Sequence, residues 1–478
     1  MPGTKHFSRR TKIVATIGPA SSSATLIERL IRAGMDVARL NLSHGTHSDH
    51  ARDIQTVRML SQRLGRPVAI MMDLPGNKYR TGKLRDGSAI LKKSAQVTLT
   101  TRQVEGDEKV VPVNLPTLPQ DVSAGDTVLL DDGAMQLRVL DTSGTEVQCR
   151  VIVGGRLTPG RGIVVPAMRT SSPFVTEVLQ THIAFAVEQQ PDYIALSFVR
   201  SPEDVEQTRT ILKQRKADIP IIAKIERGQA VASFDQILAA SDGIMVARGD
   251  LGVDIPLAKV SLVQKEIINK CNRAGKPVIT ATQMLESMVN SPRPTRAEVT
   301  DVANAIFDGT DAIMLSGETS TGKYPVPAVR TMAQIARETE RHLPYEHLLT
   351  ERGTWLKPQT DEIISYNACH TAHQLGAVAI VAFTQTGSTA RRISKYRPRM
   401  PIIALTPSKP VHGRLLLSWG VQVSHITASS SVDELFATAA QLCKDLGVAR
   451  SGDLIVITGG IPIGVTGTTN LLKVEKVT

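Results

Sequence analysis

Apolar runs of strand length alternate with helix-type patterns along two stretches of the chain, residues 1–76 and 170–341. The runs lie within residues 11–21, 37–45, 68–76, 193–199, 221–226, 243–251, 277–284 and 312–318. Continuous apolar runs between helices are typical of buried parallel strands. Eight strand–helix units predict an α/β fold of the closed (β/α)₈ barrel type, and a doubly wound open sheet is the alternative.

The pattern changes twice elsewhere in the chain. Residues 77–169 carry short alternating segments such as AQVTLT and MQLRVL, separated by Gly, Asp and Pro, which predicts an all-β domain inserted after the third barrel strand. Beyond residue 341, apolar runs at 377–384, 401–407, 421–426 and 453–459 again alternate with helical segments. We therefore expect a separate C-terminal α/β domain over residues 342–478.

Polar side chains stand at the carboxyl ends of the predicted barrel strands. They are Arg39, Asn41, Ser43, Asp73, Lys224, Glu226, Asp250, Thr282, Ser316 and Glu318. In a (β/α)₈ barrel these strand ends share one face, and active sites lie there. The barrel therefore predicts a single site, whereas an open sheet would spread the same residues along a crevice.

The segment 221–251 carries the charged residues that are most informative about the chemistry of the site. Two neighbouring apolar runs end in charge, the first at Lys224 and Glu226 and the second at Asp250. A charge at the end of a buried strand is costly unless it is used. Two carboxylates with a lysine between them suit a hard divalent cation that holds an anionic, phosphorylated substrate. The alternative is a pair of solvated strand ends joined by an ion pair.

Composition narrows the class of ligand. The formal net charge is +11, from 56 Lys and Arg against 45 Asp and Glu, which favours anionic partners. Aromatic residues are only 3% and the basic residues are scattered, so nucleic-acid binding rests on net charge alone. No segment has the length and apolarity of a membrane span or the pattern of a signal peptide, and we expect a cytoplasmic protein.

The cysteines are Cys149, Cys271, Cys369 and Cys443, with no CxxC spacing and no His/Cys cluster. They predict neither a disulfide framework nor a zinc site.

A candidate phosphate cradle follows the first apolar run of the C-terminal domain. The segment TQTGSTA, residues 384–390, places small hydroxyl residues and a glycine between a strand and a helix, where backbone N–H groups bind phosphate. Its candidate ligands are Thr384, Thr386, Gly387, Ser388 and Thr389. An ordinary βα turn is the alternative. The Gly- and Thr-rich segment 459–470 either completes the cradle or forms a flexible hairpin.

Five segments in order resemble the pyruvate kinase family, in its bacterial form. They are TKIVATIGPAS, ARLNLSHG, AKIE, ARGDLG and the long run from ATQMLES to MLSGET. The resemblance covers nearly the whole chain. It implies a barrel, a mobile β lid and a C-terminal regulatory domain, usually in a homotetramer. It also implies transfer of the phosphoryl group of phosphoenolpyruvate to ADP, which gives pyruvate and ATP in the last step of glycolysis.

The resemblance also assigns roles to the strand-end residues. Glu226 and Asp250 would hold Mg²⁺ or Mn²⁺, while Lys224 and Arg39 would hold the transferring phosphoryl group. The backbone at Gly249 and Asp250, with the Thr282 hydroxyl, would seat the substrate carboxylate. Thr282, backed by Ser316 and Glu318 through water, is a candidate proton relay to the enolate.

The nucleotide phosphates would be met by side chains of the barrel loops and of the insert. Those residues are Asn41, Ser43, His44, Arg80 and Arg161. The sequence has no GxxxxGK[ST] motif, so a P-loop is excluded.

Two positions depart from the potassium-dependent members that the chain resembles. Lys78 stands where they carry a glutamate, and Leu74 where they carry a threonine. The other potassium ligands would be Asn41, Ser43 and Asp73. An ammonium group nearby can replace the monovalent ion, so we hypothesise activity without K⁺. The alternative is that Lys78 is a surface residue of the lid hinge.

Further departures concern the insert and the cradle. RGIVVPAM replaces the family's usual lid sequence, so Arg161 is the cationic contact that remains there. Asp131 and Asp132 are predicted to form a turn rather than to close over the site. Gln385 stands where relatives that respond to sugar bisphosphates often carry lysine, which favours a monophosphate as allosteric effector.

Three other functions fit part of the pattern. A metal-dependent lyase or aldolase acting on oxaloacetate-like acids would need the same carboxylate pair, without the insert or the 41–44 run. A non-catalytic sensor of sugar phosphates would have lost the lysine or the carboxylates, and both are present. A nucleic-acid-binding protein would owe its affinity to backbone charge and would lose it with salt.

Overall fold

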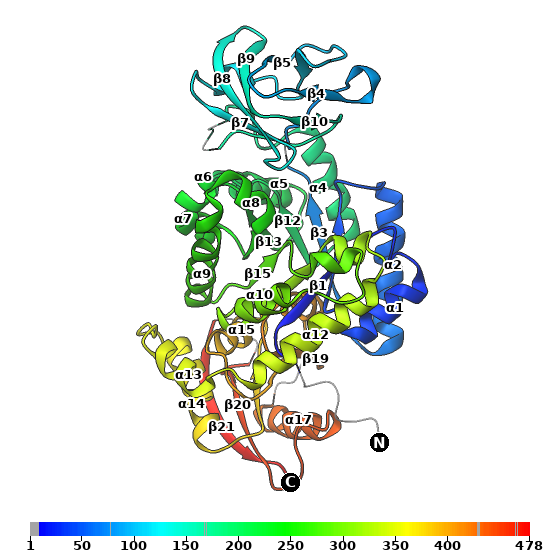
Figure 1. Ribbon diagram of the computed structural model, residues 1–478. Coiled ribbons are helices and arrows are strands. Elements are labelled where there is room, and N and C mark those ends of the chain that lie inside the picture. The colour runs from blue at the N-terminus through cyan, green and yellow to red at the C-terminus, as the bar shows by residue number, and fades with distance from the viewer. Residues whose placement is uncertain are drawn as a thin grey trace.

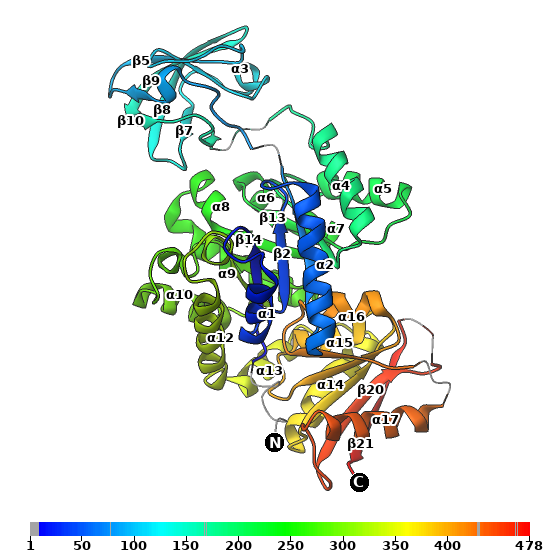
Figure 2. The same ribbon diagram turned by 90° about the vertical axis from the view of Figure 1, so that its right-hand side faces the viewer.

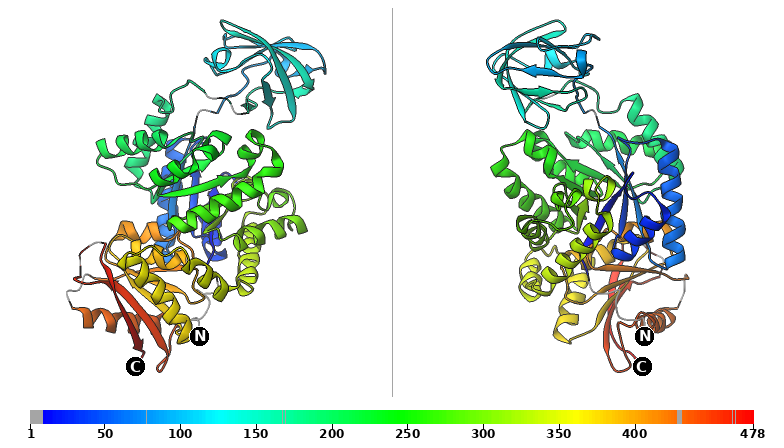
Figure 3. Two further views of the ribbon diagram at one scale, coloured as in Figure 1. Left: turned by 90° about the vertical axis from the view of Figure 1, so that its left-hand side faces the viewer. Right: turned by 45° about the vertical axis from the view of Figure 1, so that its right-hand side comes forward.

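The computed structural model describes residues 9–76, 78–166, 168, 170–427, 431–463, 465 and 467–478. Three parts follow one another along the long axis of the molecule, with a helix-covered barrel in the middle (Figure 1). The inserted domain lies at one end of the barrel and the C-terminal domain at the other (Figure 3). Within the described residues, no helix combines the length and apolarity needed to cross a bilayer.

The central part is a closed barrel of eight parallel strands, in the order β1-β16-β15-β14-β13-β12-β3-β2. Its strands are β1 (Lys12–Ile17), β2 (Val37–Asn41), β3 (Ala69–Leu74), β12 (Tyr193–Leu196), β13 (Ile221–Ile225), β14 (Gly243–Ala247), β15 (Val278–Ala281) and β16 (Ala312–Leu315). They coincide with the predicted apolar runs. The barrel prediction is confirmed, and the open sheet is excluded because β1 pairs with both β2 and β16.

Helices cover the outside of the barrel. They are α1 (Ala24–Ala33), α2 (His47–Leu64), α4 (Glu177–Gln189), α5 (Pro202–Gln214), α6 (Gly228–Ala232), α7 (Phe234–Ala240), α8 (Arg248–Asp254), α9 (Leu257–Ala274), α10 (Arg296–Phe307), α11 (Gly317–Ser320) and α12 (Pro325–Arg341), with a 3₁₀ turn η2 (Glu286–Val289). Local sequence explains several of their ends. Thr46 and Asp49 form a capping box at the start of α2, and Gly34 ends α1 with a positive φ of 122°.

The inserted domain is built from short strands around its own apolar core. The strands are β4 (Ala89–Leu91), β5 (Gln96–Thr100), β6 (Val110–Pro112), β7 (Thr127–Leu130), β8 (Met135–Ser143), β9 (Glu146–Val153), β10 (Gly155–Leu157) and β11 (Ile163–Val164). They form a six-stranded sheet, β11-β7-β8-β9-β5-β6, and a pair, β10-β4. Alternate residues such as Leu137 and Val139 are buried, as the period of two requires.

Two short helical turns, η1 (Arg85–Gly87) and α3 (Leu118–Asp121), interrupt the β pattern of the inserted domain. Asp131 and Asp132 both have φ of 52° and lie in the turn between β7 and β8, as predicted.

The C-terminal domain is a five-stranded sheet in the order β19-β18-β17-β20-β21, between helices (Figure 2). Its elements are α13 (Tyr345–Gly353), α14 (Thr360–Gln374), β17 (Ala379–Phe383), α15 (Ser388–Lys395), β18 (Ile402–Thr406), α16 (Lys409–Leu415), β19 (Val421–His425), α17 (Val432–Asp445), β20 (Leu454–Gly460) and β21 (Thr469–Lys476). The four predicted strands are present. The antiparallel edge strand β21 was not predicted, because its sequence TNLLKVEK has no continuous apolar run.

Buried polar contacts join the C-terminal domain to the amino-terminal ends of the barrel strands. Arg397 pairs with Asp311 at 2.9 Å and donates to the Asn272 side-chain oxygen at 2.7 Å. Lys12, the first residue of β1, donates to the Val421 carbonyl at 2.6 Å. The C-terminal domain therefore covers the face opposite the carboxyl strand ends. The division of the chain at residues 76, 169 and 341 stays a prediction.

Candidate active site

A cleft of about 710 Å³ opens at the carboxyl ends of the barrel strands. Its walls include most of the residues predicted for the barrel site: Arg39, Asn41, His44, Lys224, Glu226, Asp250, Thr282 and Ser316. These residues are up to 277 positions apart in the sequence, since they run from Arg39 to Ser316. Barrel closure brings them together, as the sequence pattern predicted.

A buried charge network forms the floor of the cleft. The Arg39 guanidinium donates to Asp73 Oδ2 at 2.8 Å, and the Lys224 ammonium lies 3.2 Å from Asp73 Oδ1. Arg39 also donates a hydrogen bond to Thr16 Oγ1 at 2.9 Å. The strand register explains this contact, because Thr16 of β1 lies opposite Arg39 of β2. Arg39 and Lys224 are 7% and 8% exposed, so both cations are held in place with little access to water.

The network keeps its groups charged although they are buried. Burial alone would raise the pKa of the Asp73 carboxyl, but the charges of Arg39 and Lys224 outweigh it and the pKa is lowered. Burial would likewise lower the pKa of Lys224, yet Asp73 and Glu226 together raise it. Lys224 therefore stays an ammonium group throughout the physiological pH range.

Glu226 lies between Lys224 and the backbone of the β12 loop. Its Oε1 is 3.0 Å from the Lys224 ammonium, and its Oε2 accepts the Phe198 N–H at 2.5 Å. Burial raises the pKa of Glu226, Lys224 lowers it, and the negative charge of Asp250 raises it further. The effect of the Asp250 charge on Glu226 indicates that the two carboxylates lie near each other at the cleft.

The two carboxylates fit a hard divalent cation. Both border the main cleft and also a small gap under the inserted domain. Among the described residues, no group of three or more His, Cys, Asp or Glu side chains gathers as a closed metal cage. Mg²⁺ characteristically takes one or two carboxylates and completes its shell with water and substrate oxygens, so an open pair matches its chemistry.

The loop after β15 presents Thr282 in a strained conformation. Thr282 has φ of 68°, which is costly for a β-branched residue, and its Oγ1 accepts the Gly249 N–H at 2.7 Å. Arg248 holds this loop, since its guanidinium donates to the Thr282 carbonyl at 2.8 Å and pairs with Asp301 at 2.7 Å. The structure thus brings Gly249 and Thr282 together at the cleft, next to Asp250.

Ser316 and Glu318 have different surroundings. Ser316 lines the cleft, and its Oγ is buried with no hydrogen-bond partner among the described residues. Glu318 is 1% exposed and accepts from the Leu285 and Ser316 N–H groups at 3.0 and 2.8 Å. Glu318 therefore fixes the loop that carries Ser316, and its carboxylate oxygens are already occupied by backbone donors.

The predicted nucleotide ligands divide into two groups. Asn41 and His44 line the cleft, and Ser43 is exposed beside them. Arg80 donates to the Gly160 carbonyl at 2.7 Å, and Arg161 pairs with Asp131 at 3.2 Å, so both are engaged within the inserted domain. In this structure neither arginine borders the cleft.

The predicted monovalent-cation ligands are also only partly gathered. Asn41 lies opposite Asp73 in the strand register, but the Leu74 side chain is fully buried and offers no oxygen. The Lys78 ammonium lies 3.0 Å from Asp250 Oδ1. Of the described residues, Asp250 is the one acidic partner of Lys78, and the ammonium makes no contact with Asp73.

The sequence reading missed Ser197. Its hydroxyl donates to Asp73 Oδ1 at 3.2 Å and accepts from the Lys224 ammonium at 2.8 Å. The signal was available, because Ser197 directly follows the apolar run of β12 and so occupies a strand-end position like the others. Thr16 was missed for a different reason, since a threonine inside a strand looks like an ordinary β-former.

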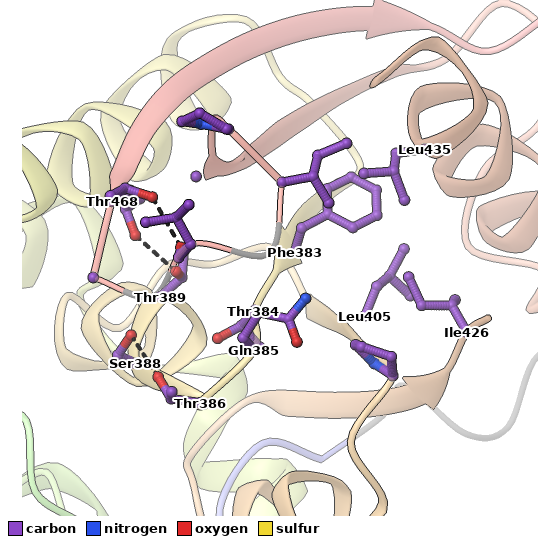
Figure 4. Close-up of a pocket in the computed structure, with 17 residues that line it drawn as sticks. Phe383, Thr384, Gln385, Thr386, Ser388, Thr389, Leu405, Ile426, Leu435 and Thr468 are labelled. Carbon is purple, nitrogen blue, oxygen red and sulfur yellow. Dashed lines mark hydrogen bonds between the residues drawn. The ribbon is translucent and has the colours of Figure 1, made fainter. Parts of the chain in front are cut away.

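A second cavity, of about 430 Å³, lies in the C-terminal domain (Figure 4). Described residues of the segments 384–389 and 460–469 both line it, so the two segments predicted for the cradle meet at one cavity. Residues 464 and 466 lie outside the described residues. The Gly387 N–H donates to Thr384 Oγ1 at 2.9 Å, and the Thr389 and Thr469 hydroxyls lie 2.7 Å apart. Gly387 has φ of 84° and makes the turn but does not itself border the cavity.

The opposite wall of this cavity is apolar. Figure 4 shows Leu405, Ile426 and Leu435 across from the hydroxyl side chains, with Phe383 between them. Of the described residues that line the cavity, none carries a charge.

Comparison with known proteins agrees with this geometry. Residues 8–329 match the family model for the pyruvate kinase barrel domain, and residues 362–475 match that for the pyruvate kinase alpha/beta domain. Pyruvate kinases of Staphylococcus aureus strains MRSA252 and USA300 are each 46% identical over 471 residues, 98% of this chain and 80% of theirs. A crystal structure of a pyruvate kinase from Cryptosporidium parvum superimposes with a TM-score of 0.95 at 36% identity, covering 100% of this chain and 98% of that one. The chain belongs to the pyruvate kinase family and is a phosphotransferase.

Proposed function

We propose that the protein transfers the phosphoryl group of phosphoenolpyruvate to ADP, forming pyruvate and ATP with Mg²⁺ or Mn²⁺ as cofactor. The observation that carries this proposal is the meeting of Arg39 and Lys224 with the carboxylates of Glu226 and Asp250 in one cleft. Phosphoryl transfer needs positioning and charge neutralisation more than covalent chemistry from the protein. A cleft floor of fixed cations beside an open carboxylate pair supplies both.

Glu226 and Asp250 would hold the divalent ion. When bound, the ion supplies positive charge to the substrate oxygens and to the enolate that forms. Lys224 and Arg39 would bind the phosphoryl oxygens, and Asp73 and Ser197 hold these two cations in position. Because both cations are buried and pre-oriented, little reorganisation is needed when charge moves during transfer.

The substrate carboxylate would lie against the backbone of Gly249 and Asp250 and the hydroxyl of Thr282. The Gly249 N–H donates to Thr282 Oγ1 at 2.7 Å, and this hydroxyl donates to the Ala281 carbonyl at 2.6 Å. The substrate carboxylate would take over these two donors. Once the phosphoryl group has left, the enolate carbon must take a proton. Thr282 and the unpartnered Ser316 hydroxyl are the groups of the cleft that fit this relay, and Glu318 positions Ser316.

The nucleotide would enter from the side of Asn41, Ser43 and His44. Arg80 and Arg161 sit on the inserted domain, so they would reach the nucleotide phosphates when this domain closes over the cleft. Closure would also exclude water, which would otherwise accept the phosphoryl group.

A coupled assay tests the reaction directly. Pyruvate formation from phosphoenolpyruvate should require both ADP and a divalent cation. Pyruvate release that proceeds at the same rate without ADP would favour a lyase or phosphatase and would overturn the proposal.

We further propose that the enzyme works without K⁺. The support is that the Leu74 side chain carries no oxygen and that Lys78 adds a positive charge beside Asp250. Turnover in buffer free of both Na⁺ and K⁺ should match turnover with KCl. A many-fold rise on adding KCl would reject this proposal and leave the main reaction intact.

The C-terminal cavity would bind a phosphorylated metabolite that activates the enzyme. Hydroxyl groups and the start of α15 suit one phosphate, and the uncharged lining with Gln385 favours a monophosphate over a bisphosphate. A thermal-shift panel of phosphorylated metabolites tests this, with Ser388→Ala as the variant and the exposed Ser451→Ala as its control. If no compound raises the melting temperature, the cavity is not an effector site.

We also infer a homotetramer in the cytoplasm, as is usual for the family. The support in this chain is an exposed sheet edge at β21 and the exposed apolar residues Leu257 and Leu262 on α9. Light scattering should give four times the chain mass of 51.6 kDa.

A further inference from the structure

The Lys78 ammonium lies on Asp250, one of the two carboxylates proposed to bind the divalent ion. The Nζ–Oδ1 distance is 3.0 Å, and the two side chains are 32% and 29% exposed. Lys78 is two residues before the first backbone pairing that joins the strands at the base of the inserted domain. A residue at the base of the inserted domain therefore occupies an oxygen that the proposed metal site would use.

Lys78 also completes a charge balance. Three carboxylates and three cations form a cluster here. Ion pairs join Arg39, Asp73, Lys224 and Glu226, and the Lys78–Asp250 pair borders the same small gap as Glu226. With Lys78 in place the formal charges cancel. If its ammonium leaves, the cluster carries one net negative charge and a free Asp250 oxygen. The cluster attracts a divalent cation more strongly in this second state.

The ion pair is suited to being broken. Partly exposed pairs are weak because water competes for both partners, whereas a divalent ion binds carboxylate oxygen at shorter range and with twice the charge. By contrast Lys224 and Arg39 are buried and have several partners each. Of these three cations, Lys78 is the one that metal binding can displace.

Movement of Lys78 would be transmitted to both connections of the inserted domain. The Ile163 N–H donates to the Tyr79 carbonyl at 2.8 Å, and the Thr81 N–H donates to the Arg161 carbonyl at 2.9 Å. The outgoing and returning chains are thus tied together beside Lys78. The Arg227 guanidinium lies 6.0 Å from the centroid of the Tyr79 ring. Arg227 belongs to the barrel and forms the barrel side of this base.

We propose that the Lys78–Asp250 ion pair is a latch that a divalent cation opens: metal binding at Asp250 displaces the Lys78 ammonium and frees the base of the inserted domain. The latch rests on the proposed metal site. It makes metal loading and domain mobility one coupled step, before either substrate binds. The latch is a different role for Lys78 from the replacement of K⁺. Replacing K⁺ requires only a positive charge at this place, whereas the latch requires the contact with Asp250.

Metal affinity of the substrate-free protein tests the first half. Mn²⁺ is titrated calorimetrically into the full chain, as wild type, Lys78→Met, Lys78→Arg and Lys83→Met. Lys83 is an exposed lysine of the same domain, so its variant removes an equal charge without touching Asp250. We expect Lys78→Met to bind Mn²⁺ about 2- to 5-fold more tightly, the range that loss of a weak competing ion pair gives. Lys78→Arg and Lys83→Met should stay within error of wild type.

Hydrogen exchange of the same proteins tests the second half. Mn²⁺ should speed exchange at residues 79–81 and 163–165 in the wild type, whereas Lys78→Met should exchange quickly with or without the metal. Equal Mn²⁺ affinity in Lys78→Met and wild type, or an equal gain in Lys83→Met, would overturn the latch. Absence of saturable Mn²⁺ binding in the wild type would instead overturn the metal site itself, so the two failures are distinct.

Discussion

The cleft of the barrel and the cavity of the C-terminal domain are both proposed to bind phosphate, and their linings are opposite in character. The cleft floor is crowded with buried charge, and Asp73 contacts both Arg39 and Lys224 directly. The C-terminal cavity has hydroxyl and apolar walls, and its described lining is uncharged. Full charges in a low-dielectric floor can stabilise a phosphoryl group in transit. Hydroxyls and backbone dipoles bind a phosphate more weakly and release it, as a regulatory ligand requires.

The largest expected effect comes from removing the central cation of the cleft. Lys224→Met should lower turnover by about 10³-fold or more, because no other group replaces a pre-oriented positive charge at the phosphoryl position. Steady-state kinetics with the pyruvate-coupled assay measures it. The exposed Lys259→Met serves as control, and turnover close to wild type in Lys224→Met would remove the basis for the assigned role.

The metal site should respond next. Glu226→Gln keeps the shape of the side chain but loses the charge, so the Mg²⁺ concentration for half-maximal rate should rise by about 10- to 100-fold. A metal titration at saturating substrate measures this. Glu206→Gln, on the surface of α5, is the matched control. An unchanged metal requirement would place the ion elsewhere.

A smaller effect is expected where a side chain only positions the site. Arg248→Met frees the loop that holds Thr282, so turnover should fall by about 10-fold or more while the protein stays folded. Asp301→Asn weakens the ion pair that holds Arg248 but leaves the hydrogen bond from Arg248 to the Thr282 carbonyl. We therefore expect a smaller loss of turnover from Asp301→Asn than from Arg248→Met. If Asp301→Asn were the more damaging of the two, the pair would act through something other than this loop.

The smallest effect belongs to the uncharged cavity. Ser388→Ala should leave the basal rate unchanged, because the residue lies in the C-terminal domain, beyond the barrel face opposite the cleft. The activating concentration of a phosphate monoester should rise about 2- to 10-fold, as expected for one lost hydrogen bond. Activation curves for wild type and Ser451→Ala provide the comparison. A changed basal rate would show that the two regions are not separable.

Much of the fold follows from local patterns. Eight apolar runs with polar ends predicted the barrel strands, and the convergence of Lys224, Glu226 and Asp250 followed from the rule that carboxyl strand ends share a face. The edge strand β21 was not predicted because its sequence mixes polar and apolar residues. An edge strand pairs with a neighbour on one side alone and does not need a continuous apolar run. Thr16 was missed because a threonine inside a strand becomes informative only when its partner is known, whereas the strand-end position of Ser197 was a signal that could have been used.

The sequence by itself determined which chemical groups stand at strand ends and which helices and strands carry them, since these depend on periodicity and capping over a few residues. Only the tertiary structure decided their pairings. It tied Glu318 to backbone donors, paired Arg80 with the Gly160 carbonyl and Arg161 with Asp131, and put Lys78 on Asp250. The reason is that hydrogen bonds and ion pairs act over about 3 Å, and contacts between residues some 170 positions apart depend on how whole domains pack.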